Sequence, residues 1–290
     1  MKRQKAPALA SIGQLRGRTN AFTLIELLVV IIIIALLAAL LLPTLAQAKA
    51  KGQGIKCLSN LRQLQIAWSS YTTDNTDKLA RNIPSDIGGG GYATSGTQAN
   101  AQPGQQYASW VLGDASSSDV TLLTHGLIYP YIGNWQAYKC PADVKVTTAN
   151  RPTLRSYAAN SQMDGYPPWP TASGGQVNFL KLTRINSSLS PAMAFVFLED
   201  NPNDINDGYW CQDLSKPNQW INCPASYHVH ACSFSFADGH GQIKKWSDKG
   251  IFAGLSTTTS ANGFTADPAS GDLAWVQARF TVVGDELDGD

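Results

Sequence analysis

Three of the four histidines lie in one short segment with other residues able to bind a metal. These are His228, His230 and His240, with Cys232 and Asp238 between them. A His-x-His pair on a strand places both rings on one face, where they could hold Zn²⁺ and activate a bound water molecule. The same segment also predicts a hairpin, with Asp238-Gly239 in the turn and His228 in a structural role. The hairpin explains more of these residues, so the sequence favours it over a zinc hydrolase.

Three carboxylates form a second candidate site. Asp200, Asp204 and Asp207 lie in one acidic loop, and carboxylate oxygens are ligands that Ca²⁺ prefers. The loop lacks the bidentate glutamate that closes an EF-hand. Acidic turn residues also accept hydrogen bonds from backbone amides. Calcium is therefore a possible cofactor, and capping of the backbone is the favoured alternative.

Five cysteines offer several pairings. In an oxidising compartment Cys57 could pair with Cys140, which would tie a helix to the domain, and Cys211 could pair with Cys223, which would staple one loop. Cys232 would then remain. Connectivity does not follow from sequence, and unpaired buried thiols are an equal alternative.

Glu26 is the single charged residue within 22–42, a run of 21 otherwise uncharged and mostly apolar residues. A run of this length predicts a membrane-spanning helix. A carboxylate inside such a helix costs roughly 2.5–3.5 kcal/mol on insertion scales and marks a functional position. The sequence therefore predicts a functional role for Glu26, whose carboxylate needs a positively charged partner.

The charges around this run predict its orientation. Five basic residues and no acidic ones precede it, and a basic flank stays in the cytoplasm: Lys2, Arg3, Lys5, Arg16 and Arg18. Without those five, 17 basic and 21 acidic residues remain. No nucleotide-binding loop or basic patch with interleaved aromatics is present, so nucleic acid is not expected as a primary partner.

Past Pro43 the helix is predicted to become amphipathic and to continue to residue 76. Leu58, Leu61, Leu64, Trp68 and Tyr71 recur at steps of three and four, which predicts an apolar stripe that packs on a domain. Gly52 and Gly54 weaken this helix locally.

Residues 77–290 predict a strand-rich domain with long loops. A surface loop is expected at 85–106, and a solvated acidic tail at 284–290. Strands are expected at 155–160 and 194–199, with the second in a central position, and the hairpin at 233–246. Asp272 could cap a helix over 273–280, although a strand there fits the pattern too.

The segment from Ala21 to Val30, AFTLIELLVV, resembles the class III signal of type IV prepilins and type II secretion pseudopilins. The resemblance implies that a prepilin peptidase cuts between Ala21 and Phe22 and methylates the new amine. Glu26 would then pair with such an amine during filament assembly. Ala21 stands where the family prefers glycine. The segment 57–64, the Cys-Pro-Ala-Asp at 140–143, and His228 followed after nine residues by Asp238-Gly239 resemble a pseudopilin subgroup of Verrucomicrobia and Planctomycetes.

The resemblance implies an α+β, pilin-like fold, in which a long N-terminal helix packs on a C-terminal antiparallel β-sheet domain. The expected organisation is a cytoplasmic leader (1–21), a transmembrane helix (22–42), its amphipathic continuation (43–76) and a periplasmic or extracellular domain (77–290). The chain would cross the inner membrane once and then enter a filament. Its expected partners are the prepilin peptidase, other pseudopilins, the inner-membrane secretion machinery and membrane lipid.

The sequence thus predicts a structural, non-enzymatic subunit of a type II secretion pseudopilus. A type IV pilus-like surface filament is the near alternative. A membrane-anchored metal enzyme, or a carbohydrate-binding module suggested by the eight tryptophans, are less favoured. Two further alternatives involve no filament: a plain membrane anchor, and a secretory signal cleaved after Ala46-Gln47-Ala48. The secretory signal fits poorly, because the apolar region of such a signal should be shorter than the 21 residues found here.

Overall fold

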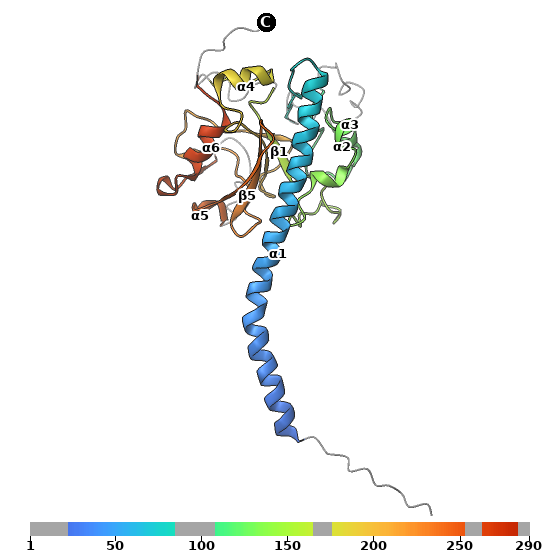
Figure 1. The fold of residues 1–290 in the computed structure, drawn as a ribbon, viewed down its shortest axis with the longest axis vertical. Helices are drawn as coiled ribbons and strands as arrows, with labels where there is room; N and C mark the ends of the chain where they lie inside the picture. The colour runs from blue at the N-terminus through green and yellow to red at the C-terminus, as the bar shows by residue number, and fades with distance from the viewer. Residues whose placement is uncertain (1–22, 85–107, 165–175, 253–262, 284–290) are drawn as a thin grey trace, which may run out of the picture. The chain divides into compact units, whose positions relative to one another are not determined.

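The structure is a computed structural model that describes residues 23–84, 108–164, 176–252 and 263–283. The leader, Ala21, Phe22, the loop at 85–106 and the tail at 284–290 lie outside the described residues. The chain divides into two compact units, Met1–Ala46 and Gln47–Asp290 (Figure 1). The amphipathic part of the long helix therefore belongs to the same unit as the strands.

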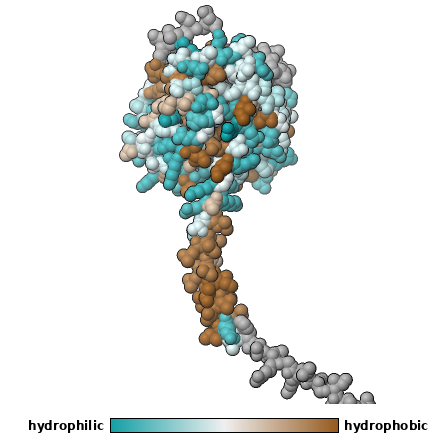
Figure 2. All heavy atoms as spheres, viewed as in Figure 1, coloured by the Kyte–Doolittle hydropathy of each residue, from teal (hydrophilic) through white to brown (hydrophobic). Residues whose placement is uncertain are grey.

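The first unit holds the apolar half of helix α1 (Leu24–Asp74). Every large apolar side chain from Leu24 to Leu45 is exposed, and Figure 2 shows these side chains along the visible face of the helix. Among the described residues this is the one helix long and apolar enough to cross a membrane. Pro43 cannot donate a backbone hydrogen bond, yet α1 continues through it.

The second unit is built on a five-stranded sheet in the order β3-β1-β2-β5-β6. The strands are β1 (Tyr157–Asn160), β2 (Phe195–Glu199), β3 (Tyr209–Trp210), β5 (Ala231–Phe236) and β6 (Gly241–Lys245). The predicted strands at 155–160 and 194–199 are thus confirmed, and β2 is central as expected. The hairpin is confirmed as the antiparallel pair β5–β6.

The sheet is mixed, whereas an antiparallel sheet was expected. β1 pairs antiparallel with β2 but parallel with β3. The acidic loop after β2 reverses the chain, which then passes β1 and pairs along its far edge. Because β2 and β1 already run in opposite directions, this reversal makes β3 parallel to β1.

Short elements surround the sheet. They are α2 (Thr121–Thr124), α3 (Tyr129–Ile132), η2 (Trp135–Tyr138), α4 (Leu182–Ser188), α5 (Lys249–Phe252), η3 (Pro268–Ser270), α6 (Asp272–Phe280) and the strand pair β4 (Gln219–Trp220) with β7 (Phe264–Thr265).

The part of α1 that belongs to the second unit begins at Gln47 and ends at Asp74, and we call it the domain part of α1. It covers one face of the sheet (Figure 1). Leu61, Leu64 and Trp68 of the predicted stripe are fully buried, in one apolar cluster with Phe197 of β2. A polar contact also joins the helix to the sheet, because the Ser235 hydroxyl on β5 donates a hydrogen bond to Gln65 Oε1 on α1 at 3.0 Å. The stripe is therefore core, as its spacing predicts.

The other face of the sheet packs against α6. Phe234 and Phe236 of β5 lie in one apolar cluster with Val276 and Phe280 of α6. The prediction of a helix over 273–280 is confirmed, but Asp272 does not cap it. The Asp272 carboxylate instead accepts hydrogen bonds from the amides of Ser247 and Asp248 at 2.6 and 2.8 Å, which anchors the end of the hairpin to α6. Both faces of the sheet are thus covered by helices.

Candidate functional sites

The start of α1 is a capping box built from Thr23 and Glu26. The Glu26 carboxylate accepts hydrogen bonds from the Thr23 backbone amide (2.9 Å) and hydroxyl (2.7 Å), and the Thr23 hydroxyl in turn accepts one from the Glu26 amide (3.3 Å). A Thr-x-x-Glu pair of this kind satisfies backbone amides that have no partner within the helix. Glu26 therefore stabilises the helix start in the unprocessed chain, a role that the sequence analysis missed although the spacing is visible in it.

The signature residues His228, Asp238 and Gly239 separate in space according to their roles. Asp238 Oδ1 accepts a hydrogen bond from the His240 amide at 3.0 Å, and Gly239 has φ +92°, a conformation that glycine adopts without strain. These two residues form the turn, as expected. His228 lies just before β5 and is buried.

The structure does not fit the less favoured alternative, a His-x-His zinc site on one strand face. Val229 and His230 have φ values of +57° and +61°, so the segment is not extended and the two histidine rings do not share a strand face. His230 packs against Phe252, with ring centroids 4.3 Å apart. The His240 ring stacks on that of Phe236, with ring centroids 4.2 Å apart, and its Nδ1 atom lies 2.6 Å from Asp238 Oδ1.

His228 belongs instead to a buried cluster that joins four distant segments. We use the term buried cluster for Cys57 on α1, Cys140 after η2, Glu199 at the end of β2, and His228. One donor atom from each side chain lies within 4.8 Å of the donor atoms of all the others. It is the single such group of three or more His, Cys, Asp and Glu side chains in the described parts of the chain. Its members are between 0 and 5 % exposed.

The imidazole of His228 is the centre of the cluster. Its Nε2 atom lies 2.8 Å from Glu199 Oε1 and 3.5 Å from Cys140 Sγ. Burial lowers the pKa of His228, but the hydrogen bonds with Cys140 and Glu199 outweigh it and raise that pKa to about 10. His228 and Glu199 therefore form a buried, hydrogen-bonded pair.

The surroundings hold these side chains in place. The Ser233 amide donates to Glu199 Oε2 at 2.7 Å, and the Ala142 amide donates to Cys140 Sγ at 3.4 Å. Gly54 leaves room for the ring, because a Cβ atom there would lie 3.1 Å from His228 Cγ. The absence of a side chain at Gly54 thus lets the His228 ring pack closely against α1.

The sequence analysis singled out Cys57, Cys140 and His228 separately but did not bring them together, and it missed Glu199. Glu199 simply ended the best predicted strand. The contacts from His228 to Cys140 and to Glu199 span 88 and 29 residues. Only the fold brings these segments together.

All five cysteines are thiols in this structure. Cys57 and Cys140 lie together in the buried cluster, as one of the expected pairings requires. Cys211 Sγ lies 2.9 Å from Asn222 Oδ1, while Cys223 Sγ lies 3.6 Å from Asn201 Nδ2. Both of these cysteines are therefore engaged with asparagine side chains.

The three calcium candidates cap the backbone. Asp200, Asp204 and Asp207 accept hydrogen bonds from the amides of Asn201, Cys223 and Tyr209 respectively. Burial raises the pKa of Asp204 to about 6. The capping role favoured from the sequence is present, and calcium binding stays a prediction.

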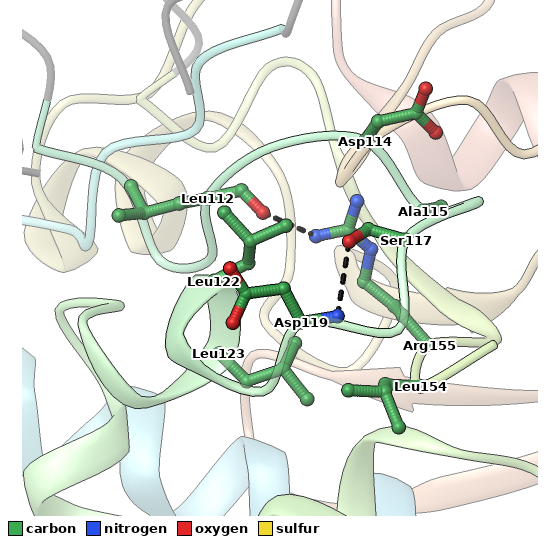
Figure 3. A pocket seen from close by; sticks show the side chains of 9 residues that line it. All are labelled: Leu112, Asp114, Ala115, Ser117, Asp119, Leu122, Leu123, Leu154 and Arg155. Carbon is green, nitrogen blue, oxygen red and sulfur yellow. Dashed lines mark hydrogen bonds between the residues drawn. The ribbon is translucent and has the colours of Figure 1, made fainter. Parts of the chain in front are cut away.

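A small pocket lies beside Arg155 (Figure 3). The buried guanidinium donates to the carbonyl oxygens of Leu112 (3.1 Å) and Gly113 (2.7 Å), and burial lowers the pKa of Arg155 to about 10. The cavity measures about 10 Å³, room for a single water molecule. This pocket therefore gives no support to a substrate site.

Comparison with known proteins identifies the amino-terminal segment. Residues 16–42 match the family model of the prokaryotic N-terminal methylation motif. No curated protein and no solved structure matches the chain. The matched region contains the expected cleavage position at Ala21 and Phe22, the capping box and the apolar half of α1. The chain therefore carries a type IV prepilin-like class III signal. Among the described residues, the one helix long and apolar enough to anchor it in a membrane is α1, which begins within this signal.

Proposed function

We propose that this chain is a structural subunit of a type II secretion pseudopilus. The peptidase would cut before Phe22 and methylate its amine, and α1 would carry the subunit into the filament. The observation that carries the proposal is the methylation motif at residues 16–42, which includes the exposed apolar part of α1. An exposed helix of this kind suits both a bilayer before assembly and a helical bundle after it.

The resemblances of segment 57–64 and of the His228–Gly239 signature to a pseudopilin subgroup favour a secretion pseudopilus over a surface pilus. We further propose that the chain has no catalytic role. The histidines that suggested an enzyme lie apart, with His230 against Phe252 and His240 against Phe236. The orientation proposed is a cytoplasmic leader and a periplasmic second unit.

The first test is mass spectrometry of the amino terminus of the protein from native membranes. We expect a chain that begins at Phe22 and carries one added methyl group. A chain that begins at Met1 or at Lys49 would contradict the proposal, because the first is an unprocessed anchor and the second is a secreted domain.

A pair of Glu26 variants tests assembly. Glutamine also forms a capping box, so Glu26→Gln keeps the helix cap and removes the charge, whereas Glu26→Ala removes both. If the charge pairs with the amine of a neighbouring Phe22, both variants should be processed by the peptidase but should not enter filaments. Cross-linking between subunits in intact cells measures this assembly. Normal assembly of Glu26→Gln would show that the cap alone matters and would contradict charge pairing.

A further inference from the structure

We propose that the buried cluster binds one Zn²⁺ ion, which joins α1 to the sheet within the second unit. This site is independent of the filament role and of the His-x-His site that the structure rules out. Its ligand atoms would be the sulfurs of Cys57 and Cys140, Nε2 of His228 and one carboxylate oxygen of Glu199.

The donor set is one that zinc prefers. Structural zinc sites use four ligands in a tetrahedron, drawn from thiolate sulfur, imidazole nitrogen and carboxylate oxygen. Metal–ligand bonds of about 2.0–2.3 Å place such donor atoms roughly 3.3–3.8 Å apart. The four donor atoms already lie within 4.8 Å of one another, and the spacing of 3.5 Å between His228 Nε2 and Cys140 Sγ falls in that range. The distance of 2.8 Å between His228 Nε2 and Glu199 Oε1 would lengthen, because the ion would replace the proton that these two atoms share in their hydrogen bond.

The surroundings are arranged for a closed site. The Ser233 amide holds Glu199 Oε2, which leaves Oε1 directed at His228. The Ala142 amide donates to Cys140 Sγ, as it would to a thiolate. His228 Nδ1, which has no hydrogen-bond partner among the described residues, would carry the ring proton while Nε2 binds the ion.

The charge balance of the bound site fits a divalent ion. When the two thiols lose their protons to the solvent on binding, two thiolates and one carboxylate would carry three negative charges in a site that is 0–5 % exposed. Burying such charges without compensation is costly, and Zn²⁺ offsets two of them. A disulfide between Cys57 and Cys140 would use only two of the four side chains and would leave His228 and Glu199 as a separate pair. A tetrahedral divalent ion uses all four, and zinc suits this donor set.

Metal content tests the proposal on the full chain, extracted from native membranes in mild detergent and carrying no polyhistidine tag. We expect close to one zinc per chain by elemental mass spectrometry. Cys140→Ser and His228→Gln should lose that zinc. The matched controls Cys223→Ser and His240→Gln change a buried thiol and a histidine outside the cluster and should keep it.

Cobalt provides a readout that does not depend on the folding of a variant. The unmodified chain, produced in medium supplemented with Co²⁺, should show thiolate-to-cobalt absorption and the visible bands of a tetrahedral ion. Absence of those bands would overturn the proposal. Zinc that persists in both ligand variants, or a Cys57–Cys140 disulfide found by differential alkylation of the native protein, would overturn it as well.

Discussion

At the scale of single residues, two glycines of α1 differ in whether they have room for a side chain. A Cβ atom at Gly52 would meet nothing within 4 Å, whereas one at Gly54 would lie 3.1 Å from His228 Cγ. Alanine is the better helix former by up to ~1 kcal/mol at either position. His228 cannot readily yield at Gly54, because Glu199 lies 2.8 Å from its Nε2 atom.

We therefore expect different results from the same substitution at the two positions. Gly52→Ala should raise the free energy of unfolding by up to ~1 kcal/mol. Gly54→Ala should leave the protein about 1–3 kcal/mol less stable than Gly52→Ala, because the added methyl group overpacks the His228 ring. Denaturant unfolding of the full chain in detergent measures both. Equal stabilisation by the two substitutions would mean that His228 does not pack on Gly54.

At the scale of elements, the domain part of α1 offers a matched pair of large apolar side chains. Leu64 is fully buried against the sheet, and Ile66, two residues on, is 58 % exposed. Leu64→Ala should cost about 2–5 kcal/mol of unfolding free energy, through lost burial and the cavity that remains. Ile66→Ala should stay within about 0.5 kcal/mol. Similar costs for the two variants, measured by thermal unfolding, would argue against the packing of α1 on the sheet.

Local patterns in the sequence predicted the elements that are themselves local. The stripe on α1, the central strand β2 and the hairpin β5–β6 follow from apolar periodicity and turn residues. The parallel pairing of β3 with β1 was not predictable, because Tyr209-Trp210 is too short for a periodic signal. Asp272 likewise satisfies the ordinary rule for a cap, yet its carboxylate bonds to Ser247 and Asp248, which tertiary packing places beside it.

The candidate sites divide in the same way. The signal segment is continuous in sequence, and its match at residues 16–42 is visible without a structure. The buried cluster is assembled from four segments, so its ligands have no characteristic spacing. The sequence analysis grouped His228 with His230, which is close to it in sequence. In the structure the side chains that contact His228 are those of Cys140 and Glu199.

At the scale of the whole molecule, the two units have opposite solvent requirements. The described part of the first unit exposes its large apolar side chains, and the second buries most of its own around a sheet covered on both faces. A bilayer suits the former and water the latter. The charges that flank the apolar run should then decide on which side of the membrane the second unit lies.

The basic leader should hold the amino terminus in the cytoplasm, because Lys and Arg near a spanning helix resist transfer across the membrane. Three lysines follow the apolar run closely and oppose this bias: Lys49, Lys51 and Lys56. Replacing the five basic residues of the leader with glutamine should therefore place the second unit in the cytoplasm in a substantial fraction of molecules. Replacing the three lysines with glutamine should leave the orientation unchanged. Protease added to spheroplasts should digest the second unit of the unmodified chain and of the three-lysine variant, but should spare much of it in the leader variant. Full protection of the unmodified chain would contradict the proposed orientation and, with it, the role in a periplasmic filament.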